Sequence, residues 1–263
     1  MEYGIHGPNI AISTACSASN VAMGYAYDLI RNGIADVMIV GGFESITEMT
    51  CAGFGVLRNL SPDTCRPFDR NRKGLVLGEG AAVVILENSE HCMRRSGRIY
   101  AEFVGYGMSS DAYHMTAPDI TGKGPALAMK KAIENSGISV QDIDYINAHG
   151  TGTLYNDLIE TASIKRVFGQ RAYGIPISST KSMHGHTLGA AGAIEAITII
   201  ATLKDSFIPP TINYETPDAK CDLDYVPNKS RDKSVNTILS NGFGFGGNNC
   251  SIVIRRFNES TDC

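Results

Sequence analysis

Three residues that could together perform nucleophilic catalysis follow predicted strands. Cys16, in STACSASN, lies between an apolar run and a predicted helix that begins near Asn20. A thiol at such a turn feels the positive end of the helix dipole, which favours the thiolate. His149, in NAHGTGT, and His186, in STKSMHGHTLGAAG, also follow predicted strands. Because ligands of α/β sheets bind beyond the carboxyl ends of the strands, we expect these three side chains to meet.

Each of these residues, taken alone, also has a structural explanation. Cys16 fits a buried structural cysteine equally well, and a single histidine at a strand end is more often structural than catalytic. The seven cysteines are scattered without a CxxC pair, so we expect neither a disulfide framework nor a zinc site. His184 and His186 form an HxH pair without further ligands, and we predict no metal. The combination of one thiol and two histidines favours a nucleophile with histidine partners.

A glycine-rich segment from Gly242 to Gly247, GFGFGG, superficially resembles a phosphate-binding loop. It lacks the GK[ST] ending of such loops, and a predicted strand follows it where a helix is needed. We expect a flexible turn whose backbone N–H groups face the site, with Phe243 and Phe245 as movable apolar covers.

Length and composition exclude several classes of protein. A chain of 263 residues, 43% apolar and 19% charged, fits one large domain or two fused ones and not a disordered chain. The net charge of -4 argues against a nucleic-acid binder. No apolar run reaches the roughly 18 residues of a membrane span, and the N-terminal sequence is not a secretory signal, so we expect a cytoplasmic protein.

Predicted strands and helices alternate, which indicates an α/β fold with mainly parallel sheets covered on both faces. The predicted strands are 11–15, 37–41, 81–87, 143–148, 175–179, 237–240 and 251–254. The predicted helices are 20–32, 124–136, 157–168 and 190–204.

An internal repeat organises these elements. The strand, small-residue turn and long helix of AISTACSASNVAMGYAYDLIRNG recur in PISSTKSMHGHTLGAAGAIEAITIIATLKD, with Lys181 at the position of Cys16. We therefore predict two similar halves, residues 1–97 and 98–263, in a layered α/β/α/β/α body whose site lies where the two turns converge. The first half is shorter than the second by roughly 68 residues, enough for two strands and their helices. We expect the N-terminal part of the first half to be absent from this chain.

Five segments, read together, resemble the β-ketoacyl synthases, which are condensing enzymes of fatty-acid and polyketide assembly with the thiolase fold. They are TACSAS, RPFDRNRKGLVLGEGAA, NAHGTGT, STKSMHGHTLGAAGA and SNGFGFGGNN. The resemblance covers essentially the whole chain and is greatest to the elongating type, which has one cysteine and two histidines. It implies an acyltransferase that condenses a cysteine-bound acyl group with malonyl-ACP (ACP, acyl carrier protein) to give 3-oxoacyl-ACP and CO2.

The resemblance also implies roles for individual residues. Cys16 would take the acyl group from a carrier thioester. His149 and His186 would promote decarboxylation of the malonyl donor, since two neutral imidazoles can donate N–H groups to the enolate oxygen. Lys181 would pair with Glu160 and organise His149.

Further residues would bind the substrate or support these groups. The backbone N–H groups of Cys16 and Phe245 would form the oxyanion hole, and Phe245 would gate the acyl pocket. Residues implied as supporting, substrate-binding or pantetheine-binding are Asp157, Thr151, Thr153, Phe243 and Phe245.

Two other functions stay open. GGFES, residues 41–45, suggests a thiolase-type acyl-CoA acyltransferase, but such an enzyme uses a second cysteine in the final glycine-rich loop, and NGFGFGG has none before Cys250. A non-catalytic or inactive ketosynthase-like partner subunit usually loses the nucleophile, whereas Cys16 is present.

The implied partners are acyl- and malonyl-loaded acyl carrier protein and a second ketosynthase-like chain, in a homodimer or heterodimer. The basic stretch 66–73, with Arg58 upstream, fits contact with an acidic carrier protein, and equally a solvated loop. The chemistry implies no metal and no redox cofactor, because decarboxylation supplies the carbon nucleophile.

Overall fold

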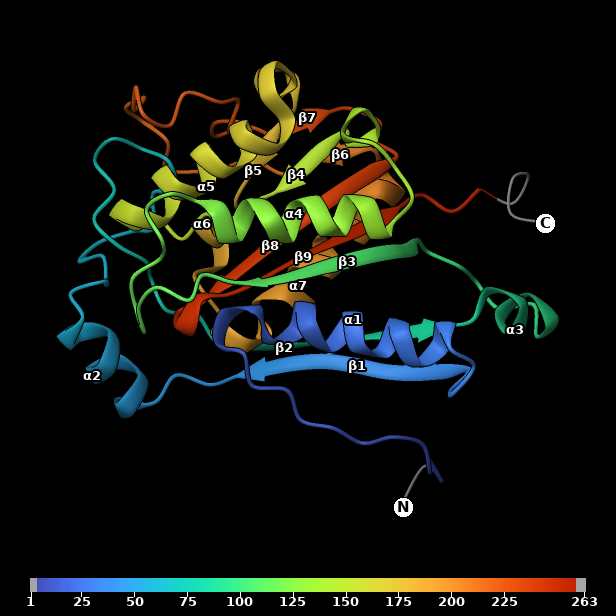
Figure 1. Ribbon diagram of the computed structural model, residues 1–263. Helices are drawn as coiled ribbons and strands as arrows, with labels where there is room; N and C mark the ends of the chain where they lie inside the picture. Colours follow the sequence, from blue (N-terminus) through green and yellow to red (C-terminus); the bar gives the residue numbers. More distant parts are fainter. Residues whose placement is uncertain (1–3, 259–263) are drawn as a thin grey trace.

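A five-stranded mixed sheet lies at the centre of the fold (Figure 1). The computed structural model describes residues 4–258. The strand order is β3-β9-β8-β4-β5; β8, β4 and β5 run parallel, and β9 is antiparallel to both neighbours. The strands are β3 (Glu102–Ser110), β4 (Tyr145–Asn147), β5 (Ile177–Ser178), β8 (Thr237–Gly244) and β9 (Asn248–Arg255).

Helices cover both faces of this sheet because successive side chains of a strand point to opposite sides. Leu239 of β8 is buried in the same core as residues of α4 and α5, whereas its neighbour Ile238 is buried with residues of α1 and α7. These helices are α1 (Ala18–Arg31), α4 (Lys123–Asn135), α5 (Leu154–Phe168) and α7 (Ala191–Asp205). Within residues 4–258, none of the helices is long and apolar enough to cross a membrane.

The strands β1 (Val37–Glu44) and β2 (Gly80–Glu87) form an antiparallel ribbon that packs against α1 and α7. Helices α2 (Glu48–Val56) and α3 (Ser89–Arg94) lie beyond opposite ends of the ribbon (Figure 1). Exposed apolar side chains on its two strands are Val37, Ile39, Phe43, Val83 and Ile85. The remaining short elements are α6 (Lys181–His184), β6 (Phe207–Ile208), β7 (Arg231–Asp232) and the 3-10 helices Ala15–Ser17, Val140–Asp142, Gly169–Gly174, Leu188–Ala190 and Phe245–Gly247.

The predicted strand 11–15 is wrong, and the repeat explains why. Its counterpart β5, which precedes Lys181, pairs only with β4. Among residues 4–258, no strand of the first half occupies the place that β4 has in the second. Residues 11–14 are therefore without a neighbour for a hydrogen-bonded ladder, and they run without regular structure into the 3-10 helix at Ala15–Ser17.

The expectation of mainly parallel sheets is also wrong, because the pairs β1–β2, β3–β9 and β8–β9 are antiparallel. Strand β3 and helices α2 and α3 were not predicted from the sequence. Strand β3 was hidden by its two glycines, which weaken a strand pattern. Gly107 is needed there because a Cβ at this position would lie 2.3 Å from the Ala128 carbonyl oxygen of α4. Helix α2 buries no side chain, so it has no apolar periodicity to detect.

Helix α1 of the first half packs against β3 of the second through a glycine. A Cβ on Gly24 would lie 2.4 Å from the Tyr106 ring, and the Tyr106 hydroxyl donates to Asp28 at 2.6 Å. The close approach of helix and strand at this point therefore depends on the absence of a side chain.

We expect Gly24→Ala to lower the free energy of unfolding by about 1–3 kcal/mol, because the added methyl group overpacks the contact with Tyr106. Gly53→Ala in the exposed helix α2 is the matched control, since nothing lies within 4 Å of that position. It should raise the free energy by about 0.5–1 kcal/mol through helix propensity. Urea unfolding measures both, and equal effects of the two variants would contradict the packing described.

Candidate active site

Cys16 lies in a tight turn that leads into α1. Ala15 before it has φ +51, in the left-handed region, and the Ser17 hydroxyl donates to the Thr14 carbonyl at 2.8 Å. The end of β8 packs directly on this turn, since a Cβ on Gly244 would lie 2.8 Å from the Thr14 oxygen. Cys16 is buried, with 7% of its surface exposed.

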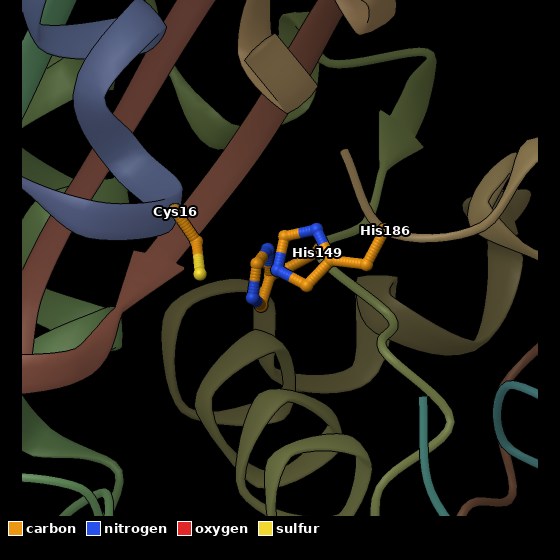
Figure 2. Close-up of side chains that lie close together, drawn as sticks. All are labelled: Cys16, His149 and His186. Carbon is orange, nitrogen blue, oxygen red and sulfur yellow. The ribbon is translucent and has the colours of Figure 1, made fainter. Parts of the chain in front are cut away.

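His149 and His186 meet Cys16, as Figure 2 shows. His149 follows β4, and His186 follows the short helix α6. The thiol and one nitrogen of each ring all lie within 4.8 Å of one another. The two rings are 5.3 Å apart and nearly perpendicular, at 83°. The structure thus brings together the three side chains that the sequence predicted to meet.

Glu160, on α5, holds the backbone at His149. Its two carboxylate oxygens accept the N–H groups of His149 and Gly150, each at 2.8 Å, and Oε1 also accepts from the Asn241 side chain at 3.0 Å. Burial raises the pKa of Glu160 to about 7, although these three N–H donors favour the ionised form. The carboxylate therefore fixes where His149 leaves the strand.

The predicted pairing of Lys181 with Glu160 is wrong. Lys181 forms its ion pair with Glu195 of α7, and both side chains are buried. Both oxygens of Glu160 are already taken by backbone N–H groups, whereas Glu195 is the one charged residue in the stretch 190–203. That isolated acid was the signal in the sequence, because a carboxylate buried on an apolar helix needs a cationic partner.

Both histidines of the site are held in the neutral form. Burial and the nearby Lys181 ammonium hold the pKa of His149 and of His186 well below 6.5, with a further contribution from His186 at His149 and from His184 at His186. Leu188 donates its N–H to Nδ1 of His186 at 3.3 Å, so the proton of the neutral ring is on Nε2. Within the described residues this Nε2 has no hydrogen-bond partner. His186 is thus a neutral donor suited to an oxygen that gains negative charge.

The expected thiolate at Cys16 is wrong for the free chain. Burial raises the pKa of the thiol to about 11 and outweighs the opposing effects of Lys181 and of the backbone N–H groups of Cys16 and Phe245. Those two N–H groups nevertheless point at the sulfur, where an oxyanion hole is expected. A neutral imidazole beside the thiol must therefore accept its proton when it reacts.

Cys16, His149 and His186 are close enough to one another to bind a metal ion, but the hydrogen bond at His186 favours binding of an anion. A metal on Nε2 of His186 would require the proton on Nδ1, where the Leu188 N–H already donates. His184 is engaged too, with Thr180 at 3.1 Å and the Gly185 carbonyl at 2.9 Å. The donor set therefore fits an anion better than a metal.

A cavity of about 220 Å³ opens onto the cysteine and the two histidines. The Thr151 and Thr153 hydroxyls are hydrogen-bonded to each other at 2.9 Å in its wall. Phe245 stacks on Phe54 of α2 with ring centres 5.5 Å apart, and Phe243 lies 5.7 Å from the His149 ring. All four predicted substrate-contacting residues therefore line one cavity; Phe54 was not predicted.

Asp157, on α5, holds the loop after His149 and part of the basic stretch 66–73. It accepts the N–H of Phe68 at 2.7 Å and that of Gly152 at 3.2 Å, and it lies 3.8 Å from the Arg72 guanidinium. The basic stretch 66–73 is thus partly used internally, since Arg72 is buried in this contact. Its exposed cations are Arg70 and Lys73, and Arg58 nearby is exposed as well.

Comparison with known proteins decides the family. The family described as "Beta-ketoacyl synthase, N-terminal domain" matches residues 1–91, and "Beta-ketoacyl synthase, C-terminal domain" matches residues 100–215. The 3-oxoacyl-[acyl-carrier-protein] synthase 2 of Coxiella burnetii is 47% identical over 97% of this chain. This chain belongs to the β-ketoacyl synthase family. Nodulation protein E of Rhizobium meliloti is 45% identical over 97% of the chain, and the chain spans 64% of the length of each of these two relatives.

Solved structures confirm the thiolase-like layered α/β fold. A type II polyketide synthase acyl-carrier protein in complex with its ketosynthase bound to the hexaketide matches with a TM-score of 0.96 and 39% identity, covering 98% of this chain and 65% of that one. A β-ketoacyl synthase from Burkholderia phymatum matches with a TM-score of 0.91 and 41% identity, covering 96% of this chain and 62% of that one.

The raised pKa of Cys16 predicts how its alkylation depends on pH. Because the thiolate reacts, iodoacetamide labelling of Cys16 should rise steadily from pH 7 towards about 11. The exposed Cys51 serves as the internal reference and should be labelled first at pH 7. Peptide mass mapping separates the two sites. Faster labelling of Cys16 than of Cys51 at pH 7 would contradict the geometry.

The buried ion pair makes a second prediction. Glu195→Gln leaves the Lys181 ammonium without its carboxylate and should lower the free energy of unfolding by about 3–5 kcal/mol. A double-mutant cycle with Lys181→Met should show coupling of about 0.5–3 kcal/mol for Glu195, and much less for Glu160→Gln. Equal coupling of Lys181 to both carboxylates, measured by urea unfolding, would show that the pairing is not specific.

Proposed function

We propose that the chain is a 3-oxoacyl-[acyl-carrier-protein] synthase that performs decarboxylative condensation at Cys16. The observation that carries the proposal is the neutral His186, whose Nε2–H is buried beside a thiol and a second neutral imidazole and has no hydrogen-bond partner among residues 4–258. Such donors favour a reaction in which negative charge develops on an oxygen of the substrate. The family supports this assignment.

The first step moves an acyl group onto Cys16. The Cys16 sulfur attacks the thioester carbonyl of acyl-ACP, and a neutral imidazole accepts the thiol proton. The carbonyl oxygen gains negative charge within reach of the backbone N–H groups of Cys16 and Phe245. The carbon–sulfur bond to the carrier then breaks, and the carrier thiol leaves with the proton.

The second step forms the new carbon–carbon bond. The malonyl carboxylate leaves as CO2, and its electron pair generates an enolate whose oxygen accepts hydrogen bonds from His149 and His186. The enolate carbon attacks the acyl carbonyl on Cys16. The bond to sulfur breaks, so 3-oxoacyl-ACP leaves with the Cys16 sulfur as a thiolate, and one proton taken up from solvent restores the thiol.

Acyl carrier protein is the partner of this proposal. A ketosynthase bound to an acyl-carrier protein is among the similar structures, and so is a ketosynthase/chain length factor for ishigamide, with a TM-score of 0.90 and 39% identity over 94% of this chain. Exposed Arg58, Arg70 and Lys73 are suited to an acidic carrier. The proposal keeps three further predictions from the sequence. The chain has two halves, 1–97 and 98–263. It pairs with a ketosynthase-like chain and is located in the cytoplasm.

Intact-mass spectrometry with octanoyl-ACP tests the first step. The chain should gain the mass of one octanoyl group, and Cys16→Ala should gain none because it lacks the nucleophile. Cys51→Ala is the matched control and should still be acylated. A folded protein that stays unmodified would refute the proposal.

Malonyl-ACP then separates condensation from thiolase chemistry. Acylated protein should release CO2 and form 3-oxodecanoyl-ACP, and His186→Ala should reduce CO2 release by at least about a hundredfold. Condensation with acetyl-CoA in place of malonyl-ACP would favour the thiolase alternative.

A further inference from the structure

The turn after His186 holds a strained residue. Leu188 has φ +44, in the left-handed region that residues with a Cβ rarely adopt. Such a conformation persists only where neighbouring groups hold it in place. Its N–H is the group that donates to Nδ1 of His186 at 3.3 Å. The proton position on His186 therefore depends on what holds this turn.

Two side chains of residues 1–97 form hydrogen bonds with the backbone of the next residue, Gly189, one with its N–H group and one with its carbonyl oxygen. Glu44, the last residue of β1, accepts the Gly189 N–H at 3.2 Å. The hydroxyl of Ser19, three residues after Cys16 on α1, donates to the Gly189 carbonyl oxygen. Both contacts come from the half that carries the nucleophile, whereas His186 belongs to the other half.

The approach of the two halves requires a glycine at position 42. A Cβ on Gly42 would lie 2.3 Å from the Ser19 hydroxyl oxygen, 2.6 Å from the Gly189 carbonyl oxygen and 2.9 Å from the Ala190 Cα. Two of these three atoms are backbone atoms of the turn. Ser19, Gly42 and Glu44 thus form one contact surface for the turn.

We propose that Glu44 and Ser19 are positioning residues that clamp Gly189 and thereby keep His186 in the tautomer with its proton on Nε2. This role rests on the proposed condensing function, in which His186 donates to the enolate. Without the clamp, Leu188 relaxes from its left-handed conformation and its N–H turns away from Nδ1. The ring then divides between two tautomers, and the one protonated on Nδ1 has no donor to offer at Nε2.

Nitrogen-15 spectroscopy of histidine-labelled protein tests the clamp directly, because protonated and unprotonated ring nitrogens have well-separated shifts. The full chain is compared with Glu44→Ala and Ser19→Ala, and His186→Ala identifies the His186 signals. We expect only the Nε2-protonated form in the unmodified chain and a mixture of both tautomers in each clamp variant. Persistence of the single form in both variants would overturn the proposal.

Two further variants separate the clamp from other effects of Glu44. Glu44 also raises the pKa of the Cys16 thiol through its charge. Glu44→Gln removes that charge but keeps an oxygen acceptor, so it should restore the single tautomer. Glu79→Ala is the matched control, since this carboxylate accepts a backbone N–H at Ile46, 3.1 Å away, and does not touch the turn. A mixed spectrum for Glu79→Ala would refute a specific clamp.

The rates of CO2 release and of Cys16 acylation give a second test of the clamp. CO2 release from malonyl-ACP should fall on the order of tenfold in Glu44→Ala and Ser19→Ala and recover in Glu44→Gln. Acylation of Cys16 should be no slower in any of the three, and in the two Glu44 variants the lost charge should favour it. An equal loss of both steps would indicate a merely structural role. The nitrogen-15 spectra need no turnover, so they test the clamp even if the protein has no condensing activity. If Glu44→Ala does not fold, Ser19→Ala tests the clamp in its place.

Discussion

The exclusion of water from the place where Cys16, His149 and His186 meet is the constraint on which the site depends. Burial keeps His149 and His186 neutral and also keeps the Cys16 thiol protonated. Burial also strengthens the hydrogen bonds that a developing charge accepts in the cavity, because fixed N–H donors and not mobile water surround that charge. The same burial obliges Lys181 to pair with Glu195, since an unpaired ammonium there would be strongly destabilising.

Three carboxylates fix the loops of the site by accepting backbone N–H groups; Glu160 and Asp157 are buried, and Glu44 is half-buried. Glu160 holds the chain at His149, Asp157 holds the following loop, and Glu44 holds the turn after His186. Each is an acid whose partner is the backbone of another segment, so each fixes a loop and not only a side chain. The positions of the two imidazoles thus follow from acids that need not touch the substrate.

The reactive groups could be located from the sequence because each follows a local apolar run, although in the structure only His149 directly follows a strand. Cys16, His149 and His186 all follow apolar runs, and the α/β order places such ends together. Glu195 could be recognised as an acid in need of a cationic partner, but its pairing with Lys181 depends on how α6 and α7 face each other, which no local pattern reveals. The thiolate prediction failed because it used the helix end alone, whereas burial decides the pKa of Cys16. The strand at 11–15 failed because a strand needs a neighbour, which no local pattern reveals.

A pH titration of the histidine ring nitrogens tests the central claim, that desolvation keeps both imidazoles neutral donors. His149 and His186 are assigned from the spectra of their alanine variants. The account predicts that their signals stay unchanged from pH 8 down to about 5.5, far enough below the ordinary histidine pKa of about 6.5 to detect protonation. A titration of either ring with a midpoint near 6.5 would contradict it.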